Sequence, residues 1–254
     1  MVKNIVTLLL FMIATAYAID IKNISEAIDV AGKQRMYTQR LLKDYAMIGM
    51  RNHFGNPEKD LQEIINNFED HLNALDRFNK DAATKTKIEE AKQAWQQIKP
   101  MLQKTPSTTD AATLQESLEK LLKLSDDVTK LFAAQSHSAT GEIINISGRQ
   151  RMLSQRMASL YMLKAWGIND PEFKKKLKDA MQLFKTSLDK LSHYDKNTPE
   201  ITALLQKAKR DFMFFEIMGR SSSKFIPALI YKKSNEILKN MNSATHLYAQ
   251  LKTN

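Results

Sequence analysis

The chain contains no cysteine and only seven glycines among 254 residues. Without cysteine it can form no disulfide, no thiolate metal site and no lipid attachment through a cysteine. It also lacks any sustained alternation of polar and apolar residues, so no strand pattern is present. The sequence is instead rich in Lys, Gln, Leu, Ala and Met, which favour helices. We therefore predict an all-α protein.

Long apolar runs are scarce too, and the main one opens the chain. Lys3 precedes a mostly apolar run from Ile5 to Ala14, and small residues follow up to Ala18. This pattern is typical of a signal peptide over residues 1–18, cleaved after Ala18; an uncleaved N-terminal anchor is the alternative. The run is short for a membrane span, which needs about 20 residues. We expect a soluble, exported protein that is periplasmic or secreted.

The formal net charge is +10. A basic exported protein can meet anionic lipid headgroups, cell-wall polymers or small anions, whereas nucleic acid is not expected in that compartment. The sequence has no glycine-rich phosphate loop, no Gly-x-Ser-x-Gly and no heme-attachment motif. Its five histidines form none of the metal-binding pairs of di-iron bundles. We predict no enzyme activity, no metal and no cofactor.

One segment occurs twice, at an offset of 116 residues. Residues 31–45 and 147–161 both contain Gly-x-Gln-Arg-Met-x-Ser/Thr-Gln-Arg, and seven of the fifteen positions are identical. The similarity continues downstream, where each motif helix ends near a glycine and is followed by Asn or Asp, Pro and Glu, the residues that begin a helix. Such a long repeat predicts two copies of one module, over residues 19–136 and 137–254.

Each copy is expected to form an antiparallel four-helix bundle, because short connections favour antiparallel neighbours. The helices are predicted at about 23–53, 57–80, 84–104 and 110–136, then at about 141–166, 171–194, 199–218 and 223–252. Pro227 should kink the last helix or mark its true start. The two bundles are joined either by a linker at residues 135–141 or by one continuous helix, and the periodicity does not decide between them.

Helical phase places Arg35 and Arg151 on the inward stripe of the two motif helices, where a leucine is usual. Gly32 and Gly148 remove one further side chain beside them. The neighbours above and below the arginines are small: Ala31 and Thr38 in one copy, Ser147 and Ser154 in the other. A guanidinium withdrawn from water needs a counter-charge. We therefore expect a carboxylate or a bound anion in this space.

Residue chemistry alone leaves both alternatives open. The carboxylate would come from Glu26, Asp29, Glu142 or an acid on another helix. The second arginines of the motif, Arg40 and Arg156, are rotated by roughly 140° from the first pair. We expect them to form salt bridges at the surface or between helices.

The motif at the head of a long helix resembles that of the PilJ-type, or NarX-like, extracytoplasmic sensor module of nitrate/nitrite sensor kinases and of the type IV pilus chemotaxis transducer. The resemblance implies a four-helix bundle in which one arginine from each partner's first helix holds an anion at a dimer interface. Those arginines match Arg35 and Arg151, and the family's glycine matches Gly32 and Gly148. The further candidates for contacting the anion are Lys33, Arg149, Thr38 and Ser154.

The resemblance predicts a binding module for a small oxyanion, either of the nitrate/nitrite class or a small carboxylate. Two copies in one chain would reproduce the pairing that the sensors obtain by dimerising. The sequence shows neither the transmembrane helices nor the cytoplasmic region of those sensors, so a membrane sensor or transducer is the expected partner. The alternative is a helical scaffold or protein-interaction module without a small-molecule ligand. The oligomeric state is left open, with a homodimer among the alternatives.

Overall fold

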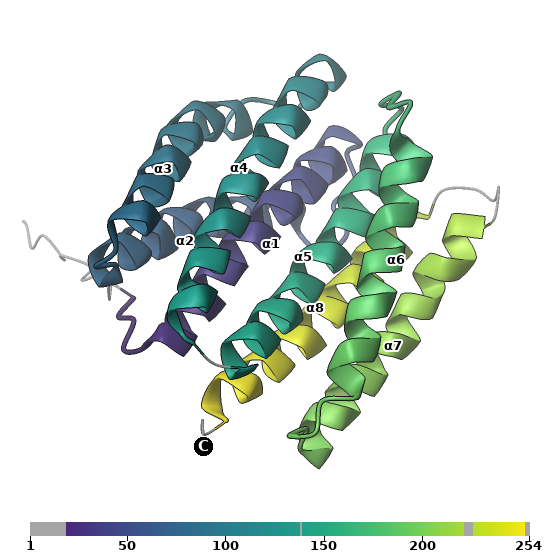
Figure 1. Cartoon of the computed structure of the whole chain (residues 1–254). Coiled ribbons are helices and arrows are strands. Elements are labelled where there is room, and N and C mark those ends of the chain that lie inside the picture. Colours follow the sequence, from purple (N-terminus) through teal and green to yellow (C-terminus); the bar gives the residue numbers. More distant parts are fainter. Residues whose placement is uncertain (1–18, 138, 221–225, 252–254) are drawn as a thin grey trace, which may run out of the picture.

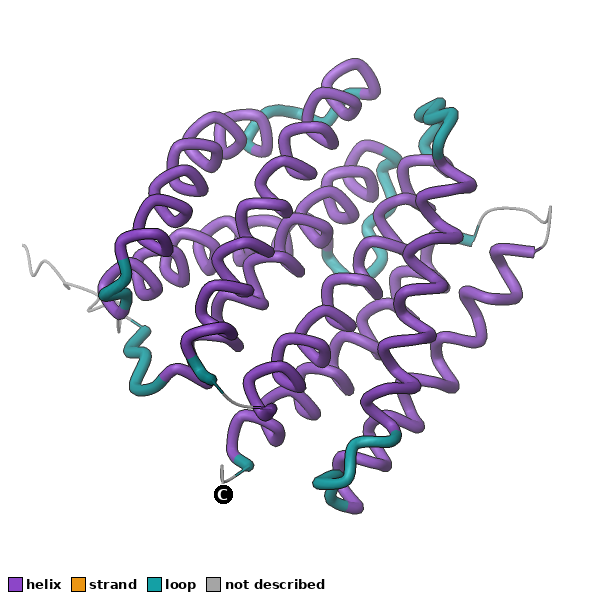
Figure 2. The backbone as a smooth tube through the Cα atoms, viewed as in Figure 1, coloured by secondary structure: helices purple, strands orange, loops and turns teal. Residues whose placement is uncertain are grey.

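The computed structural model describes residues 19–137, 139–220 and 226–251, so the predicted signal peptide lies outside the described residues. Within these ranges the chain forms eight helices and no strand (Figure 1, Figure 2). The prediction of an all-α fold is confirmed. The helices are α1 (Ile24–Gly49), α2 (Pro57–Phe78), α3 (Ala82–Leu102), α4 (Thr108–Gln135), α5 (Ala139–Ala165), α6 (Phe173–Ser192), α7 (Pro199–Arg220) and α8 (Pro227–Gln250).

Local sequence sets most of the helix starts. The side chain of Asn56 accepts a hydrogen bond from the backbone at the start of α2, and Pro57 occupies the first turn, where its missing N–H costs nothing. Pro227 likewise begins α8. In the second copy the predicted start at Pro171 is two residues early, because the Asp170 carboxylate accepts from Glu172 N in a turn (2.8 Å) and α6 begins only at Phe173.

The two motif helices, α1 and α5, pack against each other at the centre of the molecule, in the most extensive helix contact of the described chain. Helix α4 lies against α1, and α8 lies against α5. The pairs α2/α3 and α6/α7 cover the two outer sides, as Figure 1 shows. Each copy is thus a four-helix unit, and the two units meet through their first helices.

The helical structure is interrupted between the two copies. Helix α4 ends at Gln135, and His137 adopts a left-handed backbone conformation with φ 47°. Helix α5 then begins at Ala139 and runs back alongside α4 in the opposite direction (Figure 1). Of the two alternatives for this junction, the structure has a short connection and not a continuous helix.

The repeat is visible in the core as well as in the motif. Phe68 on α2 stacks on Trp95 of α3, with ring centroids 4.3 Å apart and an interplanar angle of 25°. Phe184 on α6 stacks on Phe212 of α7 at 4.5 Å and 25°. All four rings are buried. The third helix of each copy is therefore held to the second by the same aromatic contact, and Phe212 is the structural counterpart of Trp95.

Candidate functional site

Two glycines allow the first helices of the copies to approach closely. A methyl group built on Gly32 would lie 3.1 Å from Nη2 of Arg151, 3.4 Å from Nη2 of Arg35 and 4.0 Å from Cα of Gly148. A methyl group on Gly148 would meet the same two Nη2 atoms at the same distances. Both arginine side chains therefore converge on the point where Gly32 and Gly148 face each other.

Arg35 is fully buried and reaches partners from both copies. Its Nη1 donates to Oδ1 of Asp126 on α4 at 2.6 Å and to Oδ1 of Asn145 on α5 at 2.9 Å. Its Nη2 donates to the main-chain oxygen of Asn145 at 3.2 Å. One carboxylate from its own copy and one amide from the other copy therefore hold the guanidinium.

Arg151 is equally buried. Its partners stand at the equivalent positions, but Asp and Asn have changed places. Its Nη1 donates to Oδ1 of Asp29 on α1 at 2.7 Å and to Oδ1 of Asn242 on α8 at 3.0 Å, and its Nη2 donates to the main-chain oxygen of Asp29 at 3.2 Å. The carboxylate now comes from the other copy and the amide from its own. We call the two arginines and their four partners, Asp29, Asp126, Asn145 and Asn242, the arginine centre.

Three further cations reach the same two carboxylates. Lys33 Nζ lies 3.0 Å from Asp29 Oδ2, Lys130 Nζ lies 2.6 Å from Asp126 Oδ2, and Arg149 Nη2 lies 4.0 Å from Asp126 Oδ1. Among the described residues, two carboxylates therefore face five cationic side chains. The region carries an excess of positive charge.

This charge arrangement shifts the pKa values of the centre. Burial alone would raise the pKa of Asp29, but Arg151 and Lys33 outweigh it and lower that pKa to about 2. The pKa of Asp126 is lowered in the same way, with Arg35 outweighing burial. Burial lowers the pKa of Arg35 to about 10, although Asp126 opposes the shift. Both carboxylates and Arg35 are therefore charged at neutral pH.

The remaining residues that were expected to contact the anion fall into two groups. Lys33 and Arg149 lie at the edge of the arginine centre, against its carboxylates. Thr38 and Ser154 are buried, but their hydroxyls donate to the main-chain oxygens of Arg35 and Arg151, at 2.9 and 2.8 Å. These two hydroxyls are occupied by their own helices.

Of the three acids named as possible partners of the arginines, only Asp29 pairs with one, namely Arg151 of the other copy. Glu26 instead accepts from Lys22 N and Asn23 at the start of α1, and Glu142 pairs with Lys190 of α6. Both glutamates lie too far toward the helix starts, about two and a half turns from the arginines along the helix. The second carboxylate, Asp126, comes from another helix, and the motif carries no signal for it.

The second arginines of the motif form the expected interhelical salt bridges. Arg40 pairs with Asp60 of α2, with Nε 2.8 Å from Oδ2. Arg156 pairs with Glu119 of α4, with Nη1 2.6 Å from Oε1. The Arg156 pair joins the two copies, whereas the Arg40 pair lies within the first.

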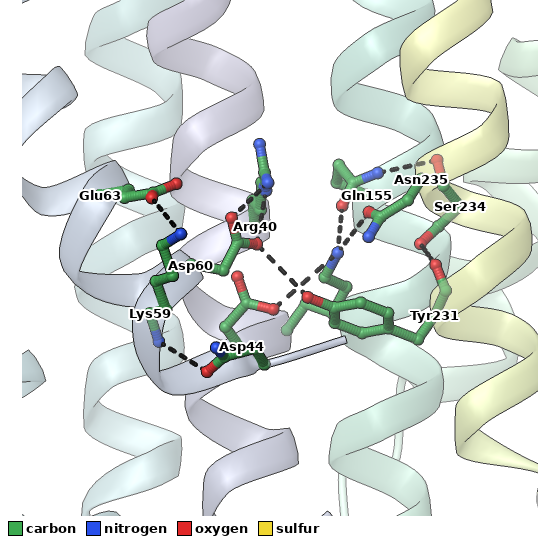
Figure 3. A network of polar contacts seen from close by, with 11 residues as sticks. Arg40, Asp44, Lys59, Asp60, Glu63, Gln155, Tyr231, Ser234 and Asn235 are labelled. Carbon is green, nitrogen blue, oxygen red and sulfur yellow. Dashed lines mark hydrogen bonds and ion pairs between the residues drawn. The ribbon is translucent and has the colours of Figure 1, made fainter. Parts of the chain in front are cut away.

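A second buried polar cluster was not foreseen (Figure 3). Lys43 on α1 is fully buried, and its Nζ donates to Oε1 of Gln155 at 2.8 Å and to Oδ1 of Asn235 at 2.7 Å. The same Nζ lies 4.0 Å from the centroid of the Tyr231 ring. Gln155, Asn235 and Tyr231 all belong to the second copy, so this cluster is another contact between the copies.

Burial controls the charges in this cluster. It lowers the pKa of Lys43 to about 8, although the neighbouring Asp44 opposes that shift. It also raises the pKa of Asp44 well above its usual value. The signal in the sequence was the departure from the repeat, because the positions that match Lys43 and Asp44 are Ser159 and Leu160.

The described residues include no group of three His, Cys, Asp or Glu side chains placed to hold a metal ion. In the same part of the chain, no helix combines the length and the hydropathy needed to cross a membrane.

The fold and the arginine centre define a class of protein: a tandem helical module whose two copies meet at buried cations. The family model described as type IV pili methyl-accepting chemotaxis transducer N-term, PilJ, matches residues 20–126 and 132–211. The chain belongs to the PilJ family. PilJ domains are typically periplasmic sensor modules. No curated protein and no solved structure matches the chain.

Proposed function

We propose that this chain is a periplasmic sensor-type input module in which the arginine centre binds a small planar oxyanion, of the nitrate/nitrite class or a small carboxylate. The observation that carries the proposal is the convergence of Arg35 and Arg151, one from each copy, on the contact between Gly32 and Gly148. Guanidinium groups suit planar oxyanions because they present parallel N–H donors. Family membership supports a sensory role, with a membrane sensor or transducer as the partner.

Two further features favour an anion. The centre has five cations against two carboxylates, so an added negative charge would be stabilised there. The Nε atoms of Arg35 and Arg151 are also buried without an acceptor among the described residues, which is costly for a charged donor. Each guanidinium therefore retains one donor that an oxyanion would satisfy.

The carboxylates of Asp29 and Asp126 would compete with such a ligand. They occupy the Nη1 donors of Arg151 and Arg35 at 2.7 and 2.6 Å. In this proposal they hold the arginines in the ligand-free state, and the oxyanion replaces one or both of them. Removing their charge should then raise the affinity for the anion and lower the stability of the ligand-free protein.

The second candidate is a helical interaction module without a small-molecule ligand. It is favoured by the same contacts, because each guanidinium already has a carboxylate, an amide and a main-chain oxygen as partners. In that case the arginine centre serves only to hold the two copies together.

A thermal-shift titration with nitrate, nitrite, acetate and sulfate separates the two candidates. An anion at about 100 times its dissociation constant should stabilise the protein by roughly 2.7 kcal/mol, which raises Tm by about 5–10 °C for a chain of this size. The double variant Asp29→Asn/Asp126→Asn should melt lower in chloride buffer and respond to lower anion concentrations. Arg35→Ala should abolish the response.

Glu26→Gln/Glu142→Gln is the matched control, because it removes two negative charges at equivalent positions outside the centre. It should leave the anion response unchanged. If no anion stabilises either the natural chain or the Asp29→Asn/Asp126→Asn variant, the oxyanion proposal is wrong and the interaction module stands. Stabilisation that survives Arg35→Ala would also overturn it, because the anion would then bind elsewhere.

A further inference from the structure

The net charge of the protein is confined to one copy. Residues 19–136 contain 17 Lys and Arg and 18 Asp and Glu, whereas residues 137–254 contain 20 and 10. The first copy is thus nearly neutral, and the second carries the whole positive excess. Because the copies share one fold, this difference is a property of their surfaces and is not required by the architecture.

The second copy also exposes apolar side chains where the first does not. On the outer face of α7, Met213, Phe214 and Ile217 are 53%, 38% and 60% exposed. The stacked pairs align Phe212 with Trp95, so the equivalent positions on α3 are Gln96, Gln97 and Pro100, all exposed. The first copy therefore carries two amides where the second carries a methionine and a phenylalanine.

Cations share this face of α7. Lys209 and Arg210 are exposed and lie four residues before Met213 and Phe214, so they occupy the same side of the helix one turn earlier. Lys233 of α8 lies 4.7 Å from the centroid of the Phe214 ring. We define the α7 surface as Lys209, Arg210, Met213, Phe214 and Ile217.

We propose that the α7 surface docks the protein on an anionic lipid bilayer. Met213, Phe214 and Ile217 would enter the interface between headgroups and acyl chains, while Lys209 and Arg210 contact the headgroups. This combination of apolar side chains and flanking Lys and Arg is the one that binds helices parallel to a membrane surface. The positive second copy adds attraction to the negative surface potential, and the neutral first copy does not.

The shape of the surface favours a bilayer over a partner helix. A partner helix inserts its apolar face into an apolar groove. The groove beside α7, of about 410 Å³, is instead lined by charged side chains of both signs, including Lys207, Asp211 and Glu236, and by a single aliphatic residue, Leu204. The exposed apolar residues Met213, Phe214 and Ile217 are not part of its lining.

Vesicle co-sedimentation of the whole protein tests this inference, which does not depend on a ligand at the arginine centre. Vesicles of phosphatidylcholine with about one third phosphatidylglycerol should bind the protein, and binding should fall as salt rises. Vesicles of phosphatidylcholine alone should bind at least tenfold less. The variant Met213→Gln/Phe214→Gln/Ile217→Gln should reduce binding to anionic vesicles about tenfold or more. Tm should change only slightly, because Met213 and Ile217 are mostly exposed and Phe214 loses only its contact with Lys233.

Phe54→Gln is the matched control, because Phe54 is 46% exposed on the first copy and lies outside the α7 surface. This variant should bind anionic vesicles as the natural chain does. The proposal is wrong if the natural chain does not bind anionic vesicles, or if the triple variant binds as well as the natural chain. Sedimentation velocity covers the remaining outcome: self-association that the triple variant abolishes, without vesicle binding, would assign the surface to a second copy of the chain and overturn the lipid proposal.

Discussion

On α1 the first copy buries Lys43 and Asp44, and at the equivalent positions on α5 the second copy has Ser159 and Leu160. Around Arg35 and Arg151, in contrast, the same guanidinium atoms bond to equivalent positions in the two copies, although Asp and Asn are exchanged between them. Each guanidinium bonds to a carboxylate at 2.6 or 2.7 Å, to an amide oxygen at 2.9 or 3.0 Å and to a main-chain oxygen at 3.2 Å. The copies therefore agree at one end of their shared contact and differ at the other.

The contacts that repeat are those that the duplicated fold needs. Gln34 donates to the main-chain oxygen of Phe68 on the following helix, and Gln150 donates to that of Phe184, both at 3.0 Å. The contacts that do not repeat involve residues that only one copy has. The two copies therefore differ at Lys43, in surface charge and on α7, and agree where the shared fold is built.

The largest effect should come from removing either arginine of the centre. Arg35→Ala leaves Asp126 without its buried partner, and Arg151→Ala does the same to Asp29. Each should lower the free energy of unfolding by about 3–5 kcal/mol, measured by urea denaturation. Because the two environments match, the two losses should agree within about 1 kcal/mol. Arg77→Ala, at an exposed arginine, is the control and should cost under 1 kcal/mol.

A smaller effect should distinguish the copies by pH. The folded-state pKa of Lys43 is about 8, below the ordinary value of 10.5. Between these values the unfolded chain binds more protons than the folded one, so stability should rise with pH over this window. Of this rise, Lys43 should contribute up to about 3 kcal/mol.

Urea denaturation at pH 7.5 and pH 10 measures that contribution. Lys43→Met should remove it, and Lys59→Met, at a lysine that is 71% exposed on α2, should leave it in place. An equal pH dependence in the natural chain and the Lys43→Met variant would show that burial does not lower the pKa of Lys43.

The smallest effect concerns the aromatic stacks. Trp95 Nε1 donates to Oε1 of Glu69 at 3.0 Å, and Phe212 has no such donor. Trp95→Phe makes the first copy resemble the second and should cost about 1–2 kcal/mol, from one hydrogen bond and some lost packing. Thermal unfolding measures the change. A loss as large as that expected for Trp95→Ala, about 3–5 kcal/mol, would mean that the stack itself had been broken.

Sequence periodicity was sufficient to predict the helices and the burial of Arg35 and Arg151. Both predictions are confirmed. Helical phase depends only on residues within one helix, so Arg35 and Arg151 could be placed on the inward stripe without knowledge of their neighbours. Helix ends were predicted less well: the sixth helix was expected to start at residue 171 but begins at Phe173.

Apart from Asp29, the individual partners of the arginines could not be predicted because they depend on how separate helices pack. Asp126 reaches Arg35 from α4, and Asn145 reaches it from the other copy. Neither contact leaves a pattern within the motif. The buried Lys43 cluster was missed for a related reason, since a Lys-Asp pair in a helix is ordinarily a solvated one.

The exchange of Asp and Asn in the arginine centre determines which units can pair. Two first copies facing each other would surround each arginine with two carboxylates, at positions 29 and 126, and two second copies would offer only amides. Only the unlike pair supplies one negative charge to each arginine. A symmetric homodimer repeats every residue on both sides, so the fused chain has become a heterodimer on one polypeptide, whose halves are complementary to each other and not to themselves.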